Sequence, residues 1–143
     1  MDVEDLLDAF KTVFLADDGP GLAELYDTPY THFRARQNFV HTDRSSFIAD
    51  AQAIRGAYAR LGLARMEYEI HNVQTFDPGL TLATVEWIYY TSDNTEIVRH
   101  DCTMGIRDHN GTLRFAFHIA HNEYVRRPAF ISPADRGGSE DLI

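Results

Sequence analysis

Residues 81–122 read TLATVEWIYYTSDNTEIVRHDCTMGIRDHNGTLRFAFHIAHN. Apolar and polar residues alternate through most of this stretch, and a period of two residues is typical of strands with one buried and one polar face. Asp93-Asn94 and Asn110-Gly111 interrupt the alternation, and residues of these types favour the tight turns of β-hairpins. The stretch therefore predicts an antiparallel meander.

The same pattern extends back to residue 65, because Pro78-Gly79 suits a turn whose second residue has a positive φ. Four strands are expected, at about residues 65–76, 81–91, 96–108 and 113–124. Hairpin turns fix strand register, so closing each hairpin on its turn residues predicts one row of facing side chains. This row contains Ile70, Trp87, His100 and His121.

The chain before residue 65 has a helical period instead. Apolar residues between Val3 and Phe14 recur at helical spacing, with Asp2 as the expected cap. A third helix, capped by Asp43, is expected to end at Gly62. Between these two helices we expect a short helix at 22–26 and extended segments at 30–34 and 37–41.

The two faces of the predicted sheet differ in character. One face, which carries the predicted row, is overwhelmingly apolar and must therefore cover the helices. The other face is polar but includes Ile88, Tyr90 and Ile97, which favours either the seam of a homodimer or a solvated surface. His32, His41 and His109 are expected at the surface, and His118 on the polar face.

Three stretches carry a resemblance to a known family: residues 80–87 (LTLATVEW), residues 107–111 (RDHNG) and residues 117–121 (FHIAH). Together with the order of elements, over about residues 3–124, they resemble the NTF2-like superfamily, or cystatin-type cone, in its SnoaL-like and ketosteroid-isomerase-like branch. The resemblance implies an α+β fold with N-terminal helices in the concavity of a curved, mostly antiparallel sheet. It also implies a homodimer whose cone holds a hydrophobic small molecule, in an enzyme or in a pure binder.

His100 and His121 are the candidate catalytic residues. Two imidazoles side by side in an apolar pocket can act as acid and base near neutral pH, although core histidines satisfied by each other, by a tyrosine or by Glu123 give the same pattern. The expected ligand-contacting residues are Tyr58, Tyr68, Trp87, Tyr89, Cys102, Met104 and Phe117.

Other chemistries fit the sequence less well. His100, Cys102 and His121 share the predicted face, but they lack a recognised zinc spacing, so no metal or cofactor is expected. Steroid-isomerase-type members of the superfamily use an acidic base, and the predicted row contains no Asp or Glu. Histidines combined with tyrosines resemble the dehydratases of this fold more closely.

Composition limits the partners and the compartment. A formal charge of −9 repels nucleic acid and anionic membranes. Cys102 is the only cysteine, and no secretory leader or membrane-spanning apolar run is found, which indicates a cytoplasmic protein. We expect one domain at residues 1–124 and an irregular extension at 125–143.

Two functions therefore remain open. In the first, the cone binds a small apolar or cyclic molecule, with acid–base chemistry of the isomerase, cyclase or dehydratase type by His100 and His121. In the second, the chain is a non-catalytic ligand-binding or dimerisation module whose pocket is filled by its own aromatic side chains.

Overall fold

The computed structural model describes residues 1–34 and 36–121, and it confirms the predicted α+β class. In chain order the elements are α1 (Val3–Leu15), α2 (Gly19–Ala23), β1 (Tyr26–Phe33), β2 (Asn38–His41), α3 (Arg44–Arg60), β3 (Arg65–Asp77), β4 (Leu80–Tyr90), β5 (Glu96–His109) and β6 (Thr112–Ala120). The predicted extension at 125–143 lies outside the described residues. Within the described part of the chain, no helix is long and apolar enough to cross a membrane.

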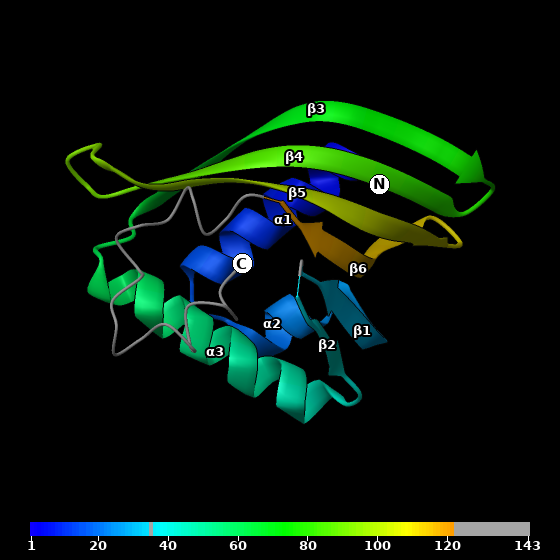
Figure 1. Cartoon of the computed structure of the whole chain (residues 1–143), viewed down its shortest axis with the longest axis horizontal. Coiled ribbons are helices and arrows are strands. Elements are labelled where there is room, and N and C mark those ends of the chain that lie inside the picture. Colours follow the sequence, from blue (N-terminus) through cyan, green and yellow to red (C-terminus); the bar gives the residue numbers. More distant parts are fainter. Residues whose placement is uncertain (35, 122–143) are drawn as a thin grey trace.

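The strands form one six-stranded sheet in the order β2-β1-β6-β5-β4-β3. Every neighbouring pair is antiparallel except β1 and β6, which are parallel. Figure 1 shows β3, β4 and β5 arching over α1, with all three helices on the same concave side of the sheet. The concave, inner face of the sheet is therefore the one that packs against the helices.

The helices begin at acidic caps. Asp2 accepts a hydrogen bond from the backbone N–H of Asp5 at 2.9 Å, and Asp43 caps α3 in the same way. The predicted position of the second helix is wrong, because α2 begins at Gly19 rather than at residue 22. Asp18 caps this helix, and Pro20 lies in its first turn, where a proline needs no N–H partner.

The predicted turns have the expected backbone. Gly79 has a φ of 98°, and Asn110 and Gly111 have φ values of 56° and 96°. The connection between β4 and β5 is longer than predicted, because Tyr90 pairs with Glu96 and leaves residues 91–95 as the loop. Despite this longer loop, the predicted pairing of Trp87 with His100 is confirmed.

Two β-bulges change the register between β3 and β4. One lies between Ile70 and Asn72 and the other between Thr75 and Asp77, and each adds one residue to β3. The prediction that Ile70 faces Trp87 is therefore wrong, and Tyr68 takes that position. Because two insertions restore the original alternation, the even-numbered residues of early β3 still face the helices.

A single bulge between β5 and β6 has a different effect. Ile106 pairs with Phe115 but Gly105 pairs with Phe117, so Ala116 is the extra residue. One insertion reverses the faces of everything that follows it in β6. The prediction that His121 faces His100 on the inner face is therefore wrong.

The residues after the bulge exchange faces. His118 pairs with Met104 and is buried on the inner face, contrary to the prediction that places it on the polar face. Phe117 lies on the outer face, so the prediction that it lines the interior is wrong. His121 is exposed, and its Nε2 shares a 2.9 Å hydrogen bond with the hydroxyl of Thr103, also on the outer face.

Candidate functional site

Three histidines are buried inside the cone. His32, His100 and His118 have exposed fractions of 4%, 0% and 3%. His32 and His118 pair directly across the parallel strands β1 and β6. Their ring centroids are 3.6 Å apart with an angle of 33° between the ring planes, so the two imidazoles are in contact at a tilt.

Tyr30 adds a third polar side chain to this histidine pair. Its hydroxyl and Nδ1 of His118 share a hydrogen bond. Burial raises the pKa of Tyr30 well above its ordinary value, and Tyr26 and Cys102 nearby raise it further. Tyr30 is therefore a neutral phenol at physiological pH and can donate its proton to the imidazole. We call Tyr30, His32 and His118 the histidine–tyrosine cluster.

Aromatic side chains surround the cluster on the helix side. The Tyr30 ring lies 4.7 Å from Tyr26 and 5.9 Å from Phe47, between ring centroids, and both contacts are edge-on. Phe47 comes from α3, so this helix covers the cluster. On the sheet side, Met104 faces His118 across the strands. Among the described residues, the cluster is thus packed against aromatic side chains and Met104.

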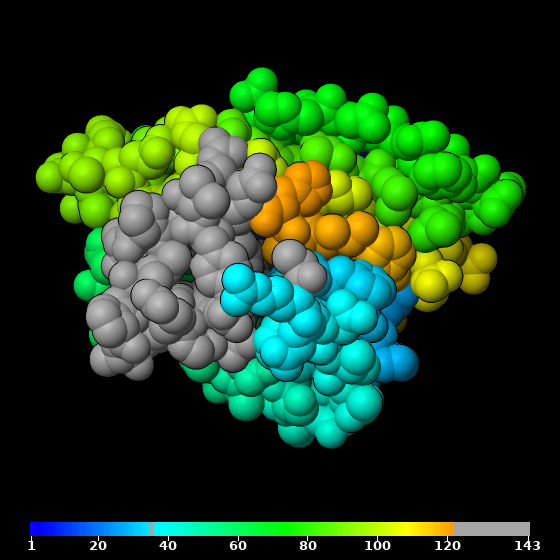
Figure 2. Space-filling view, viewed as in Figure 1, coloured from blue at the N-terminus to red at the C-terminus, as the bar shows by residue number. Residues whose placement is uncertain are grey.

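The outer surface of this region is formed by neighbouring strands. β1 lies between β2 and β6, and the three strands make one end of the sheet. Figure 2 shows this end of the sheet, with β6 in orange and the blue-to-cyan chain of β1 and β2 below it.

The other end of the cone is filled by aromatic residues predicted to contact a ligand. Tyr58, Trp87 and Tyr89 have exposed fractions of only 0%, 3% and 2%. The rings of Tyr58 and Tyr89 are 4.8 Å apart, and the Trp87 ring lies 5.1 Å from Phe10 of α1. These side chains pack against one another and against the helices as a dense core.

His100 belongs to this aromatic end. It faces Trp87, and its ring lies 5.5 Å from that of Tyr89. His100 is four residues from Met104 along β5, which is about 13 Å of strand, whereas His118 is directly opposite Met104. The structure therefore separates His100 from the histidine–tyrosine cluster.

The structure also shows where the other residues predicted to contact a ligand lie. Cys102 and Met104 are buried on the inner face, with exposed fractions of 1% and 7%. Tyr68 is only partly buried, and its hydroxyl donates a 2.8 Å hydrogen bond to Asp8 of α1. Partial burial and this bond to Asp8 raise the pKa of Tyr68. The metal-ligating set considered from the sequence is not assembled, because His121 is on the outer face.

Sequence reasoning missed all three members of the cluster. His32 was expected at the surface, yet it is buried because β1 lies in the interior of the sheet rather than at its edge. One pattern could have revealed His118: the consecutive apolar residues Phe115, Ala116 and Phe117 break the alternation. Such a break in a predicted strand is a reason to expect a bulge.

The curved sheet over three helices defines an α+β cone of the cystatin type. A model of the family described as "NTF2-like protein (DUF6841)" matches residues 1–123. The chain therefore belongs to this family of NTF2-like proteins, as the resemblance in the sequence implied. No curated protein matches the chain.

Solved structures share this fold at low sequence identity. A domain of unknown function with a cystatin-like fold from Nostoc punctiforme has a TM-score of 0.66 at 13% identity, over 97% of this chain and 82% of that one. A ketosteroid isomerase-like protein from Erwinia carotovora atroseptica has a TM-score of 0.59 at 14% identity, over 82% and 90%. A putative calcium/calmodulin-dependent protein kinase type II association domain from Thiobacillus denitrificans has a TM-score of 0.66 at 15% identity, over 84% and 95%. Similarities at this level establish the fold alone.

Proposed function

We propose that this protein binds a small apolar or cyclic molecule in its cone, with the histidine–tyrosine cluster at the polar end of the site. The observation that carries the proposal is the buried, hydrogen-bonded pair of Tyr30 and His118, with the ring of His32 3.6 Å from that of His118 between centroids. Burying polar groups costs free energy unless they are hydrogen-bonded, so such groups are uncommon in a purely structural core. A region that served only as core would be expected to contain apolar residues instead.

The cluster has the groups that acid–base chemistry needs. Tyr30 keeps its proton because its pKa is raised, so it serves as a donor and not as a base. Nδ1 of His118 shares a hydrogen bond with Tyr30, so proton exchange with a ligand would use Nε2 of His118. An isomerase, cyclase or dehydratase type of reaction requires this kind of proton transfer at a carbon or oxygen of the ligand.

The site residues predicted from the sequence have different roles in this proposal. Cys102 and Met104 remain candidate contacts for the ligand, since both lie on the inner face near the cluster. His100 belongs to the closed aromatic end with Trp87, where it supports the shape of the site. His121 is exposed on the outer face and takes no part.

A second function is favoured by a different observation. The dense packing of Tyr58, Trp87 and Tyr89 supports a non-catalytic module whose cone is filled by its own side chains. The structural neighbours include both kinds of protein by name, a ketosteroid isomerase-like protein and a putative association domain. Under either function we propose a cytoplasmic homodimer joined through the outer face of the sheet.

Native mass spectrometry of the gently purified full-length protein tests the ligand-binding proposal. We expect a non-covalent organic adduct on the wild type, whose mass gives a short list of ligands. Tyr30→Phe and His118→Gln should reduce the bound fraction more than about tenfold, since each loses a polar contact worth about 1.4 kcal/mol or more. Circular dichroism establishes that both variants are folded.

Tyr90→Phe and His109→Gln serve as matched controls. They remove the same chemical groups at positions outside the cone, where Tyr90 contacts Arg65 and His109 pairs with Asp27. Both controls should keep the adduct. A wild type without any adduct would count against ligand binding. Cluster variants that are more stable than the wild type in the absence of ligand would show that the fold does not need the cluster. An adduct that survives both cluster substitutions would place the site elsewhere.

A further inference from the structure

Two carboxylates face each other on the outer side of the sheet. Glu69 of β3 and Glu86 of β4 are direct cross-strand partners. Like charges at directly opposed positions destabilise a sheet. Among the residues that the structure describes, Glu86 is also one of the few buried charged residues, with an exposed fraction of 9%. This arrangement needs a compensating positive charge.

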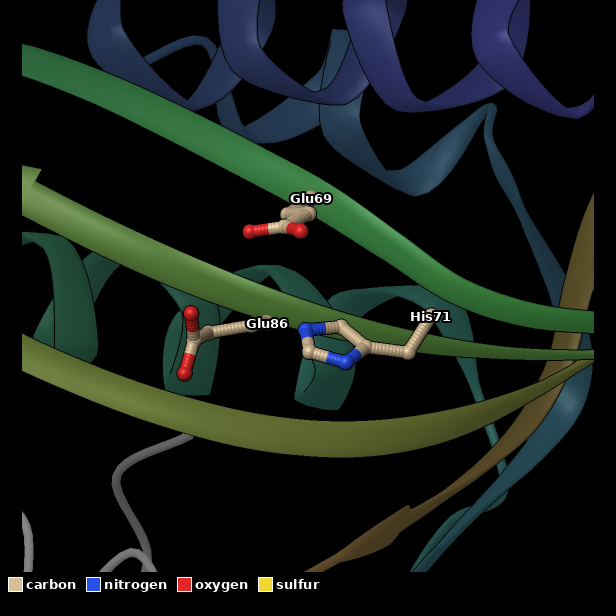
Figure 3. Close-up of side chains that lie close together, drawn as sticks. All are labelled: Glu69, His71 and Glu86. Atoms are coloured by element: carbon tan, nitrogen blue, oxygen red, sulfur yellow. The ribbon is translucent and has the colours of Figure 1, made fainter.

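The bulge in β3 brings an imidazole to the same place. His71 is the extra residue between Ile70 and Asn72, so its position is set by the bulge and not by regular alternation. Figure 3 shows the three side chains together on one side of the sheet, with the His71 ring beside Glu86. One ligand atom from each of Glu69, His71 and Glu86 lies within 4.8 Å of the other two.

We propose that Glu69, His71 and Glu86 form a binding site for a divalent transition-metal cation, with Zn²⁺ as the best match. Zinc accepts imidazole nitrogen and carboxylate oxygen, and three protein ligands leave a fourth position for water. Tetrahedral zinc separates its ligand atoms by about 3.3 Å, so small side-chain rotations complete the set. The net charge of −9 favours the approach of a cation.

Arg99 already supplies part of the compensating charge. Its Nη1 lies 3.0 Å from Oε1 of Glu86, and its Nη2 lies 2.8 Å from Oε1 of Glu96. The guanidinium therefore lies on the β5 side of Glu86, whereas Glu69 and His71 approach from β3. The metal and Arg99 would share Glu86, and the positive charge of Arg99 would lower the affinity for the metal.

Isothermal titration of the untagged, metal-free full-length protein with Zn²⁺ tests the site. We expect one Zn²⁺ per chain, with His71→Ala and Glu69→Gln each weakening the affinity more than about tenfold, because even the outer partners of metal sites are worth about 10–100-fold. His109→Ala is the matched control. It removes another exposed histidine, which pairs with the single carboxylate of Asp27, and it should leave the affinity unchanged.

A further variant tests the sign of the Arg99 effect. Arg99→Gln keeps a hydrogen-bonding side chain but removes the positive charge beside Glu86, so the affinity for Zn²⁺ should rise several-fold. Titration with Co²⁺ gives a second readout, because visible absorption reports the ligands directly. Absence of stoichiometric zinc binding at millimolar concentration, or binding that is unaffected by His71→Ala, would overturn the proposal.

Discussion

The ring of Phe117 occupies the space on the outer face where a β carbon at Gly105 would lie. A Cβ built on Gly105 would be 2.3 Å from Cε1 of Phe117, far inside van der Waals contact. The two residues are direct partners across β5 and β6, immediately after the bulge at Ala116. The absence of a side chain at Gly105 thus permits Phe117 to face outward, and this orientation of Phe117 accompanies the inward orientation of His118.

Gly105→Ala should therefore destabilise the protein. The added methyl group must displace the Phe117 ring, and overpacking of this kind costs about 1–3 kcal/mol. Urea unfolding followed by the fluorescence of Trp87, the single tryptophan, measures this loss.

The double variant Gly105→Ala/Phe117→Ala is the control for that prediction. Without the ring, the methyl group at residue 105 has space, so adding Gly105→Ala to Phe117→Ala should change the free energy of unfolding by less than about 0.5 kcal/mol. An equal loss in both backgrounds would mean that the glycine is required for another reason.

The bulges explain why the sequence predicts the fold better than the site. Alternation, turn residues and caps predict α1, α3 and the four strands β3 to β6, since each depends on local chemistry, but they misplace α2. The face that a side chain occupies depends instead on the number of extra residues between it and the turn. Two bulges in β3 cancel, so Tyr68 stays on the predicted face, whereas the single bulge at Ala116 reverses His118 and His121.

The position of β1 is the other feature that local patterns do not contain. Tyr30 and His32 lie two residues apart in a short strand, which places them on one face but does not say what that face contacts. Their burial follows from the parallel pairing of β1 with β6, at the opposite end of the sequence. The candidate site is formed by this long-range pairing, so it could not be derived from neighbouring residues.

Charge substitutions at His118 of β6 and at His121, which directly follows β6, test which histidine is inside. His118→Lys places a charge in the interior and should cost more than about 3 kcal/mol or prevent folding. His121→Lys changes an exposed residue and should alter stability by less than about 0.5 kcal/mol. Thermal unfolding of both variants under identical conditions provides the comparison. Similar stabilities, or the reverse order, would contradict the observed register.

The raised pKa values of three tyrosines predict a loss of stability at alkaline pH. Burial raises the pKa values of Tyr26 and Tyr30, and partial burial with the bond to Asp8 raises that of Tyr68. Because the folded state holds these protons more tightly than the unfolded state, their contribution is complete below about pH 10 and falls as the pH rises above it. The free energy of unfolding should therefore decrease from pH 9 to pH 11 (about one unit either side of the ordinary tyrosine value).

Tyrosinate absorbance at 295 nm checks the same assignment. We expect a fraction of the seven tyrosines to ionise only as the protein unfolds. Tyr68→Phe should reduce the slope of stability against pH in this range, since one of the linked protons is removed. Ionisation of all the tyrosines near pH 10 in a protein that stays folded would show that none of these pKa values is raised.

An apolar patch on the outer face identifies where the proposed homodimer can be tested. Phe33 and Ile119 pair across β1 and β6 and have exposed fractions of 37% and 39%, whereas Ile88 is 7% exposed and offers little surface to a partner. Ile119→Lys should therefore produce monomers in analytical ultracentrifugation, because a charge at the centre of an apolar interface loses several kcal/mol of association energy. Val73→Lys is the control, since Val73 is equally apolar and 47% exposed but lies on β3, at the opposite edge of the sheet from β2. A dimer that survives Ile119→Lys, or dissociates equally with Val73→Lys, would exclude the β1–β6 surface as the seam.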